Sequence, residues 1–158
     1  MQRLQALLID AAVVRYLRSA EDPASGQVQK MGHRLDGAFC QKINTLAGLY
    51  VDQGQYAQAE PLFRRALAIN EKSLGPDHPA VAKSVNSLAV LYTNQGQYTQ
   101  AEPLYKRALA IREKTLGPNH HAVAASLENL AVLYRDTKRV AEAVRLEQLA
   151  AKIRAISS

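Results

Sequence analysis

The sequence predicts an all-α protein, a right-handed superhelix of stacked antiparallel helical hairpins. The main observation is a tandem repeat of 42 residues, because residues 44–84 and 86–126 carry the same amino acid at 29 of 41 positions. A second observation is that apolar residues recur at helical spacing within each repeat. The composition agrees, since the chain of 158 residues has no Trp and is rich in alanine and leucine, two strong helix formers.

The repeat divides the chain into four segments. Two full repeats are expected at residues 40–81 and 82–123, followed by a divergent closing repeat at 124–158 that caps the stack. In this last repeat the run Arg135–Arg139 replaces the glycine-containing turn of the earlier repeats. Residues 1–39 show no convincing match to the repeat, so they are either a degenerate earlier repeat or a capping helical segment.

Each repeat is expected to form two helices joined by a glycine turn. In the first helix of the first repeat, apolar residues at i, i+3, i+4 and i+7 form one buried face: Ile43, Leu46, Ala47 and Tyr50. Gly54 ends this helix, because glycine adopts the left-handed conformation at a helix C-terminus without steric strain. The second helix carries a similar set toward the same core: Ala59, Leu62, Phe63, Ala66 and Ile69. Pro61 lies in or just beyond its first turn, and Gly75 and Pro76 end it.

The linkers between repeats contain residues that suit helix capping. Asp77 or His78 is expected to cap the helix that starts near Pro79. In the following linker, Asn119 is expected to supply the capping side chain, while His121 replaces the proline.

Small residues recur at the same places in all three repeats, where they allow the two helices of a hairpin to approach closely. These residues are Ala47, Ala59 and Ala66, then Ala89, Ala101 and Ala108, then Ala131, Ala143 and Ala150. A lone hairpin cannot bury such an apolar face, so neighbouring repeats are expected to stack on one another.

Charge and cysteine content exclude several classes of function. The net charge is +6, but basic and acidic residues are interleaved, which favours a solvated mixed surface over a nucleic-acid patch. Glu60 with Arg64, and Glu102 with Lys106, form favourable i, i+4 pairs. The single cysteine, Cys40, excludes an intrachain disulfide and is expected to be buried.

No apolar run approaches the length that spans a bilayer, so we expect a soluble, cytoplasmic protein with no membrane partner.

The sequence contains no recognisable motif for catalysis or cofactor binding. It has no glycine-rich phosphate loop and no nucleophile elbow. His78, His120 and His121 lie in the linkers without carboxylates or cysteines at metal-ligand spacing, so helix capping is favoured over metal binding. We therefore expect no enzyme activity, no metal and no cofactor.

The pattern LAxLY…GxY…A…RAL resembles the tetratricopeptide repeat. The 42-residue length, with the phrases QGQYxQAEPL, RALAIxEKxLGP and His78-Pro79-x-Val81-Ala82, is similar to the kinesin light chain variety of this repeat. The resemblance covers about residues 40–156. It implies a scaffold that binds a protein or peptide in the concave groove lined by the first helices.

A spaced stripe opposite the Leu-Ala-Tyr core of the first helices is the predicted peptide-binding face. Its candidate residues are Asn44 in the first repeat, Lys83, Asn86, Val90 and Asn94 in the second, and Glu128 and Arg135 in the third. By resemblance, Asn44 and Asn86 match asparagines that contact bound peptides, and an amide can donate and accept hydrogen bonds at once. Because Lys83 and Arg135 add positive charge to this face, we expect a partner with acidic residues.

Alternatives to this interpretation remain open. The asparagines could instead cap or bridge adjacent hairpins, and the stripe could be merely solvated. A short solenoid with repetitive faces could also associate end to end into a homo-oligomer. The family's clamp for the C-terminal carboxylate of a chaperone needs a lysine and an asparagine one turn apart. Since Asn44 is followed one turn later by Gly48, and Asn86 by Val90, that ligand is not expected.

Overall fold

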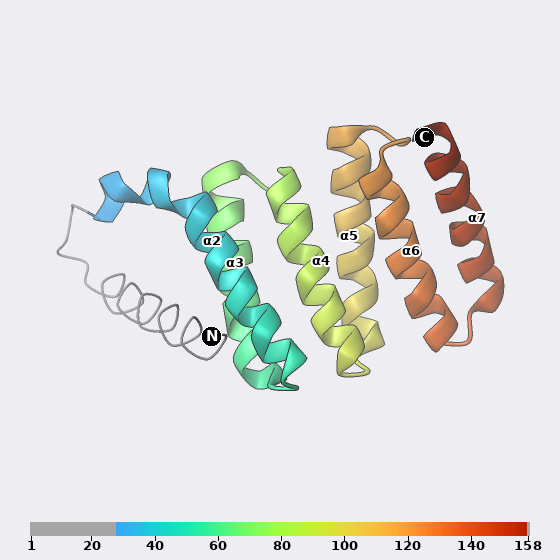
Figure 1. The fold of residues 1–158 in the computed structure, drawn as a ribbon, viewed down its shortest axis with the longest axis horizontal. Helices are drawn as coiled ribbons and strands as arrows, with labels where there is room; N and C mark the ends of the chain where they lie inside the picture. The colour runs from blue at the N-terminus through green and yellow to red at the C-terminus, as the bar shows by residue number, and fades with distance from the viewer. Residues whose placement is uncertain (1–27, 158) are drawn as a thin grey trace. The chain divides into compact units, whose positions relative to one another are not determined.

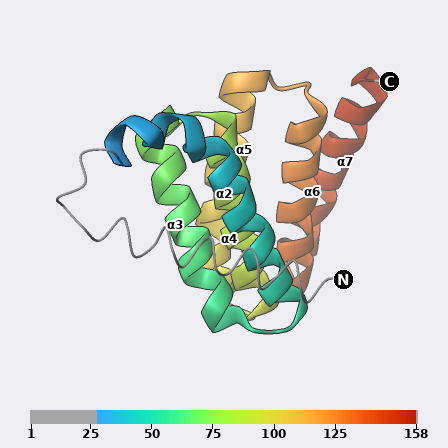
Figure 2. The ribbon, with the colours of Figure 1, turned by 60° about the vertical axis from the view of Figure 1, so that its left-hand side comes forward.

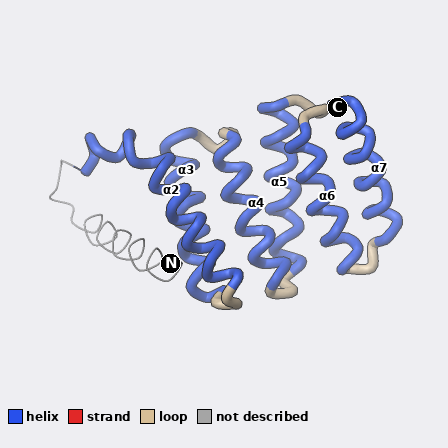
Figure 3. Tube along the Cα trace, viewed as in Figure 1, coloured by secondary structure: helices blue, strands red, loops and turns tan. Residues whose placement is uncertain are grey.

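The computed structural model describes residues 28–157; residues 1–27 and 158 are not described (Figure 1). In this range the chain forms helices joined by short loops, as Figure 3 shows. The helices are α2 (Val28–Asp52), α3 (Tyr56–Leu74), α4 (Pro79–Asn94), α5 (Tyr98–Leu116), α6 (His121–Asp136) and α7 (Val140–Ser157). The prediction of an all-α fold is confirmed for the described residues.

The predicted segments relate to these helices in two ways. The expected boundaries at residues 82 and 124 fall just inside α4 and α6, which begin at Pro79 and His121. The helix α2 has 25 residues against 16 in α4, since it begins at Val28, before the first expected repeat. Most of the segment 1–39, and with it the question of a cap or a degenerate repeat, lies outside the described residues.

The chain divides into two compact units, residues 1–73 and 74–158. In the first unit α2 and α3 bury apolar side chains at the expected spacing. The buried set includes Ile43, Leu46, Ala47, Ala59, Phe63 and Ala66. Cys40 is also buried, and its Sγ atom donates to the carbonyl oxygen of Ala66 at 3.8 Å. The prediction of a buried cysteine is therefore confirmed.

The second unit consists of two hairpins, α4–α5 and α6–α7, and α5 also packs against α6 (Figure 2). The recurring alanines of both hairpins are almost fully buried, as close helix packing requires. Within this unit one apolar cluster joins α6 and α7: Val123, Ala124, Leu127, Ala150 and Ile153. Leu109 of α5 packs against this cluster, so α5 helps to bury the core of the next hairpin.

The turn between the two helices of a hairpin needs a residue with positive φ. Gly54 and Gly96 supply it at φ 72° and 70°. In the third repeat the same place is held by Lys138 at φ 63°, the only described residue other than glycine with positive φ. The divergent run that replaces the glycine turn therefore keeps the same backbone shape at a steric cost.

Histidines cap the first helices of the second unit. The Nδ1 atom of His78 accepts from the backbone amide of Ala80, and that of His120 accepts from Ala122, both at 3.1 Å. The expectation that Asn119 caps the later helix is wrong, because the N-cap is the residue directly before the first helical residue, which is His121.

Candidate protein-binding face of the first helices

The candidate face of the second unit is carried by α4 and α6, the first helices of its two hairpins. Lys83 and Asn94 lie on the exposed surface of α4, and Asn86 between them is half-buried. Helical periodicity places Lys83, Asn86 and Val90 on successive turns of one side of the helix. On α6, Glu128 and Arg135 occupy the corresponding side, so each helix presents its predicted residues together.

Asn86 and Asn129 connect the two first helices. The Nδ2 atom of Asn129 donates to the Oδ1 atom of Asn86 at 3.1 Å. The alternative in which an asparagine bridges adjacent hairpins is therefore seen for Asn86. The bond uses one side of each amide, so the Nδ2 atom of Asn86 and the Oδ1 atom of Asn129 can still serve a partner. Asn129 lies one position out of register with Asn44 and Asn86, so the repeat pattern alone does not select it.

Two charged candidates are paired inside their own hairpin. Arg135 donates to Glu147 of α7 through Nε at 2.6 Å and Nη2 at 2.7 Å. Glu128 accepts from Nε and Nη2 of Arg154, both at 2.7 Å. Because Arg154 donates these bonds, the pKa of Glu128 lies below the usual value of a glutamate. The charges of Arg135 and Glu128 are thus neutralised within the hairpin. Lys83 therefore contributes the clearest positive charge of the predicted face.

Exposed valines lie at equivalent places on the two first helices. Val90 of α4 is 36% exposed and Val132 of α6 is 54% exposed. Val90 follows Asn86 by one helical turn, and Val132 follows Glu128 by one turn. The predicted stripe includes Val90, and Val132 stands 42 residues after it at the same position of the repeat. The face therefore combines apolar side chains with amide groups.

Asn44 occupies the corresponding position of α2 in the first unit. It is half-buried, and its Oδ1 atom is enclosed without a hydrogen-bond partner among the described residues. An enclosed polar oxygen without a partner is costly, so this atom favours a water molecule or a ligand donor nearby.

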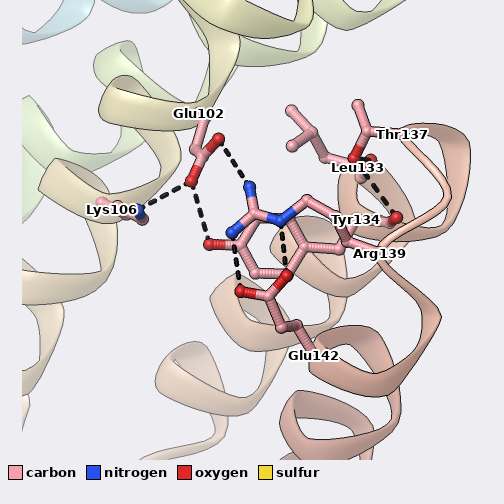
Figure 4. A network of polar contacts seen from close by, with 7 residues as sticks. All are labelled: Glu102, Lys106, Leu133, Tyr134, Thr137, Arg139 and Glu142. Atoms are coloured by element: carbon pink, nitrogen blue, oxygen red, sulfur yellow. Dashed lines mark hydrogen bonds and ion pairs between the residues drawn. The ribbon is translucent and has the colours of Figure 1, made fainter.

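A second polar cluster links α5 to the hairpin α6–α7 (Figure 4). Glu102 accepts from the hydroxyl of Tyr134 at 3.1 Å and from Nη1 of Arg139 at 3.0 Å, and it pairs with Lys106 at 2.7 Å. Arg139 also lies over the ring of Tyr134 and binds both carboxylate oxygens of Glu142.

Hydrogen bonds explain the titration of this cluster. The bond from Lys106, followed by those from Arg139 and Tyr134, lowers the pKa of Glu102 against the opposing effect of burial. The charges of the cluster are mutually satisfied across the junction between the hairpins. Such an arrangement stabilises packing and leaves no carboxylate placed for acid or base chemistry in this cluster.

The described part of the chain contains no group of three or more His, Cys, Asp or Glu side chains that could hold a metal ion. None of its helices is both long and apolar enough to cross a membrane. The expected i, i+4 pair of Arg64 with Glu60 is formed at 2.9 Å on the exposed surface.

Known proteins share this repeat. The model of the family described as tetratricopeptide repeat matches residues 40–114 and again residues 81–155. A solved structure of BtubC (BKLC) from P. vanneervenii is similar, with 27% sequence identity and a TM-score of 0.70 over 76% of this chain and 47% of that one. No curated protein matches the sequence significantly.

A second similar structure is a kinesin light chain-type protein of Podosopora anserina with nearly identical TPR-like repeats. It shows 32% identity and a TM-score of 0.69 over 80% of this chain and 58% of that one. The chain thus spans about half the length of the solved relatives it matches. The predicted resemblance to kinesin light chain-type repeats is confirmed.

Proposed function

The chain belongs to the tetratricopeptide repeat family, and we propose that it is a scaffold that binds a polypeptide segment along the first helices. In the second unit the segment lies across α4 and α6, where Asn86, Val90 and Val132 contact it. Asn44 is the proposed contact at the matching position of α2. The scaffold performs no catalysis in this proposal.

The observation that carries the proposal is the pair of exposed valines at equivalent repeat positions. Single apolar residues on a surface are ordinary, but Val90 and Val132 recur at one position of the repeat, and each follows the asparagine of the amide pair on its helix by about one turn. Burial of both against apolar side chains of a partner would be favourable, by roughly 25 cal/mol for each Å² of apolar surface removed from water. The repetition favours a segment that meets successive first helices in the same way.

The amide pair supplies the polar part of the proposed site. The Nδ2 atom of Asn86 can donate to a peptide carbonyl, and the Oδ1 atom of Asn129 can accept from a peptide amide. One donor and one acceptor suit the backbone of an extended segment, whatever its side chains are. The hydrogen bond between the two amides fixes their orientation before binding, which reduces the entropy lost on association.

Charge refines the expected partner. Lys83 is exposed one turn before Asn86, so an acidic residue of the partner is placed best at that end of the face. Arg135 retains its Nη1 group for a second carboxylate while Nε and Nη2 hold Glu147. Asn94 lies exposed near the last turn of α4 and extends the polar border. The partner segment is therefore expected to carry apolar side chains over the valines and an acidic group near Lys83.

The test uses peptides selected from a random display library against the full chain, followed by calorimetric titration. Val90→Lys and Val132→Lys place a charge on the proposed face. Val144→Lys, at an exposed valine of α7, is the matched control. Binding is expected to weaken about tenfold or more in each face variant and to stay unchanged in the control, with equal helicity in all chains. Selected peptides that bind both face variants with wild-type affinity would contradict the proposal.

A further inference from the structure

The helix α5 receives the next hairpin through three residues on one side. Glu102 accepts from Tyr134 and Arg139, at 3.1 and 3.0 Å. Leu109 packs against the apolar cluster of α6 and α7. Arg112 donates through Nη1 to the carbonyl oxygen of Ala122 at 3.2 Å and to Oγ of Ser126 at 2.6 Å.

The outer face of α7 consists of the residues that stand 42 positions after this receiving side. They are Val144, Ala151 and Arg154, at the positions of Glu102, Leu109 and Arg112, and Glu147 stands between them at the position of Tyr105. Consider a further hairpin that docks on α7 in the way that α6–α7 docks on α5. It would meet a surface that differs from that of α5. Its tyrosine hydroxyl would face Val144, which accepts no hydrogen bond. Its apolar cluster would face Ala151, whose side chain is too short to replace that of Leu109.

Two pairs of residues, each with one member on α7 and the other on α6, differ together from their counterparts one repeat earlier. In the hairpin α4–α5, the hydroxyls of Thr93 and Tyr105 lie 3.4 Å apart, and Tyr105 is only 4% exposed. At the same two positions, hairpin α6–α7 has Arg135 and Glu147, which form a bidentate ion pair whose side chains remain 48% and 39% exposed.

The second pair has also been replaced by an ion pair within the last hairpin. Asn86 accepts from the next first helix and Arg112 donates to it, so both residues reach across the junction. Their counterparts Glu128 and Arg154 bind each other within one hairpin. A docked hairpin would have to desolvate both ion pairs, and the desolvation of buried charges is costly.

We propose that the outer face of α7 excludes a further hairpin of this repeat type, so that no second copy of the chain stacks there as α6–α7 stacks on α5. The changes at Val144 and Ala151 remove contacts that such a hairpin needs. The ion pairs of Glu128 and Arg135 hold the polar groups in water. The face is therefore the closing surface of the regular stack.

The test appends a hairpin to the complete chain. A second copy of residues 117–158 is joined directly after Ser158, which keeps the 42-residue register because Ser158 stands at the position of Leu116. The copy carries Ala124→Cys as a reporter, since Ala124 is fully buried when this hairpin docks on α5. Cys40→Ala makes the reporter the only thiol. The control is the chain without the added copy, with Ala124→Cys at its native place.

The thiol of the appended copy is expected to react with a thiol reagent about as fast as in the unfolded chain. In the control chain it is expected to react roughly 100-fold more slowly, because reaction there requires local opening. A second fusion restores the receiving side with Glu128→Asn, Arg135→Thr, Val144→Glu, Glu147→Tyr and Ala151→Leu. Its thiol is expected to be protected like that of the control.

Protection of the thiol in the fusion with the native face would overturn the proposal. So would a restored fusion that is fully helical by circular dichroism and still leaves its reporter exposed. If the restored fusion does not fold, the comparison between the native-face fusion and the control chain decides alone.

Discussion

Asn129 of α6 donates a hydrogen bond to Asn86 of α4 at 3.1 Å, so the first helices of two consecutive hairpins are joined through side-chain amides. This bond lies at the centre of the face that we propose for partner binding. The two asparagines therefore contribute to stacking before any partner is present. Their effects on stability and on binding must be measured separately.

Replacement of either asparagine should reveal the bridge. Asn86→Ala and Asn129→Ala are each expected to cost about 0.5–1.5 kcal/mol of unfolding free energy, since each leaves the other amide with one bond fewer. The double variant should cost clearly less than the sum of the two, because the shared bond is lost only once. Urea unfolding of the four chains measures this coupling. Asn94→Ala, at an exposed position of α4, is the control, and additive costs would show that the bridge is absent in solution.

The core of the second unit should be sensitive to changes of volume at two adjacent positions. Leu88 is 3% exposed and Ala89 is fully buried. Leu88→Ala leaves a cavity and is expected to cost about 2–5 kcal/mol. Ala89→Leu overpacks the close contact between helices and is expected to cost about 1–3 kcal/mol. Thermal midpoints that match the wild type in both variants would contradict the packing described for α4.

The last hairpin turn offers a stabilising substitution. Lys138 has φ 63° at the place where Gly96 has φ 70°. Lys138→Gly is expected to raise the unfolding free energy by about 0.5–1 kcal/mol, because it removes the strain of a side chain in the left-handed region. Gly96→Lys is the reciprocal control and should destabilise the chain by a similar amount, since the space around Gly96 is open and only the backbone is strained. A melting temperature that falls in Lys138→Gly would argue against this account.

The fold could be predicted because its signals are local. The spacing of Leu88, Ala89 and Tyr92 within one helix, and its recurrence 42 residues later, requires no knowledge of distant contacts. The positions of the glycine turns follow from the same pattern. The capping residue of α6 was misassigned by one position. Asn119 and His120 are both suitable caps, and only the position at which the helix begins decides which of them is the cap.

The partners of the charged candidates could not be predicted in the same way. Glu128 and Arg154 are 26 residues apart, and Arg135 and Glu147 are 12 apart. Which of several exposed acids a long arginine side chain reaches depends on the separation of two helices and on rotamers, and neither is encoded in the periodicity. Comparison of equivalent repeat positions could have indicated both pairs, since the two members of each pair change together in the last repeat.

Removal of a histidine cap should destabilise α6. The Nδ1 atom of His120 accepts from the amide of Ala122, so His120→Ala leaves this first-turn donor without its partner. A loss of about 1 kcal/mol in unfolding free energy is expected. His121→Ala is the control, because His121 is exposed and begins the helix rather than capping it. Equal stability of the two variants would show that the cap contributes nothing.

Acidification should weaken the junction between α5 and the last hairpin. Hydrogen bonds from Lys106, Arg139 and Tyr134 lower the pKa of Glu102 below the ordinary glutamate value of 4.5 in the folded chain. The unfolded chain then binds more protons in this range, so stability falls as the pH decreases below about 4.5 and through the lower folded pKa. Above that value the contribution of Glu102 is fully present. The urea midpoint is therefore expected to change little through Glu102 between about pH 7 and pH 5, and to drop at lower pH.

The substitution Glu102→Gln isolates this carboxylate from the other groups that titrate in acid. The variant is expected to be less stable than the wild type at neutral pH, because Lys106 and Arg139 lose a charged partner. Its urea midpoint should fall less steeply in acid, and the difference between the two chains should shrink as the pH falls below the lowered pKa of Glu102 in the folded chain, where the native carboxyl is protonated as well. Parallel midpoint curves over the whole range would mean that Glu102 titrates identically in the folded and unfolded chains. The network of Figure 4 would then not contribute to the junction in solution.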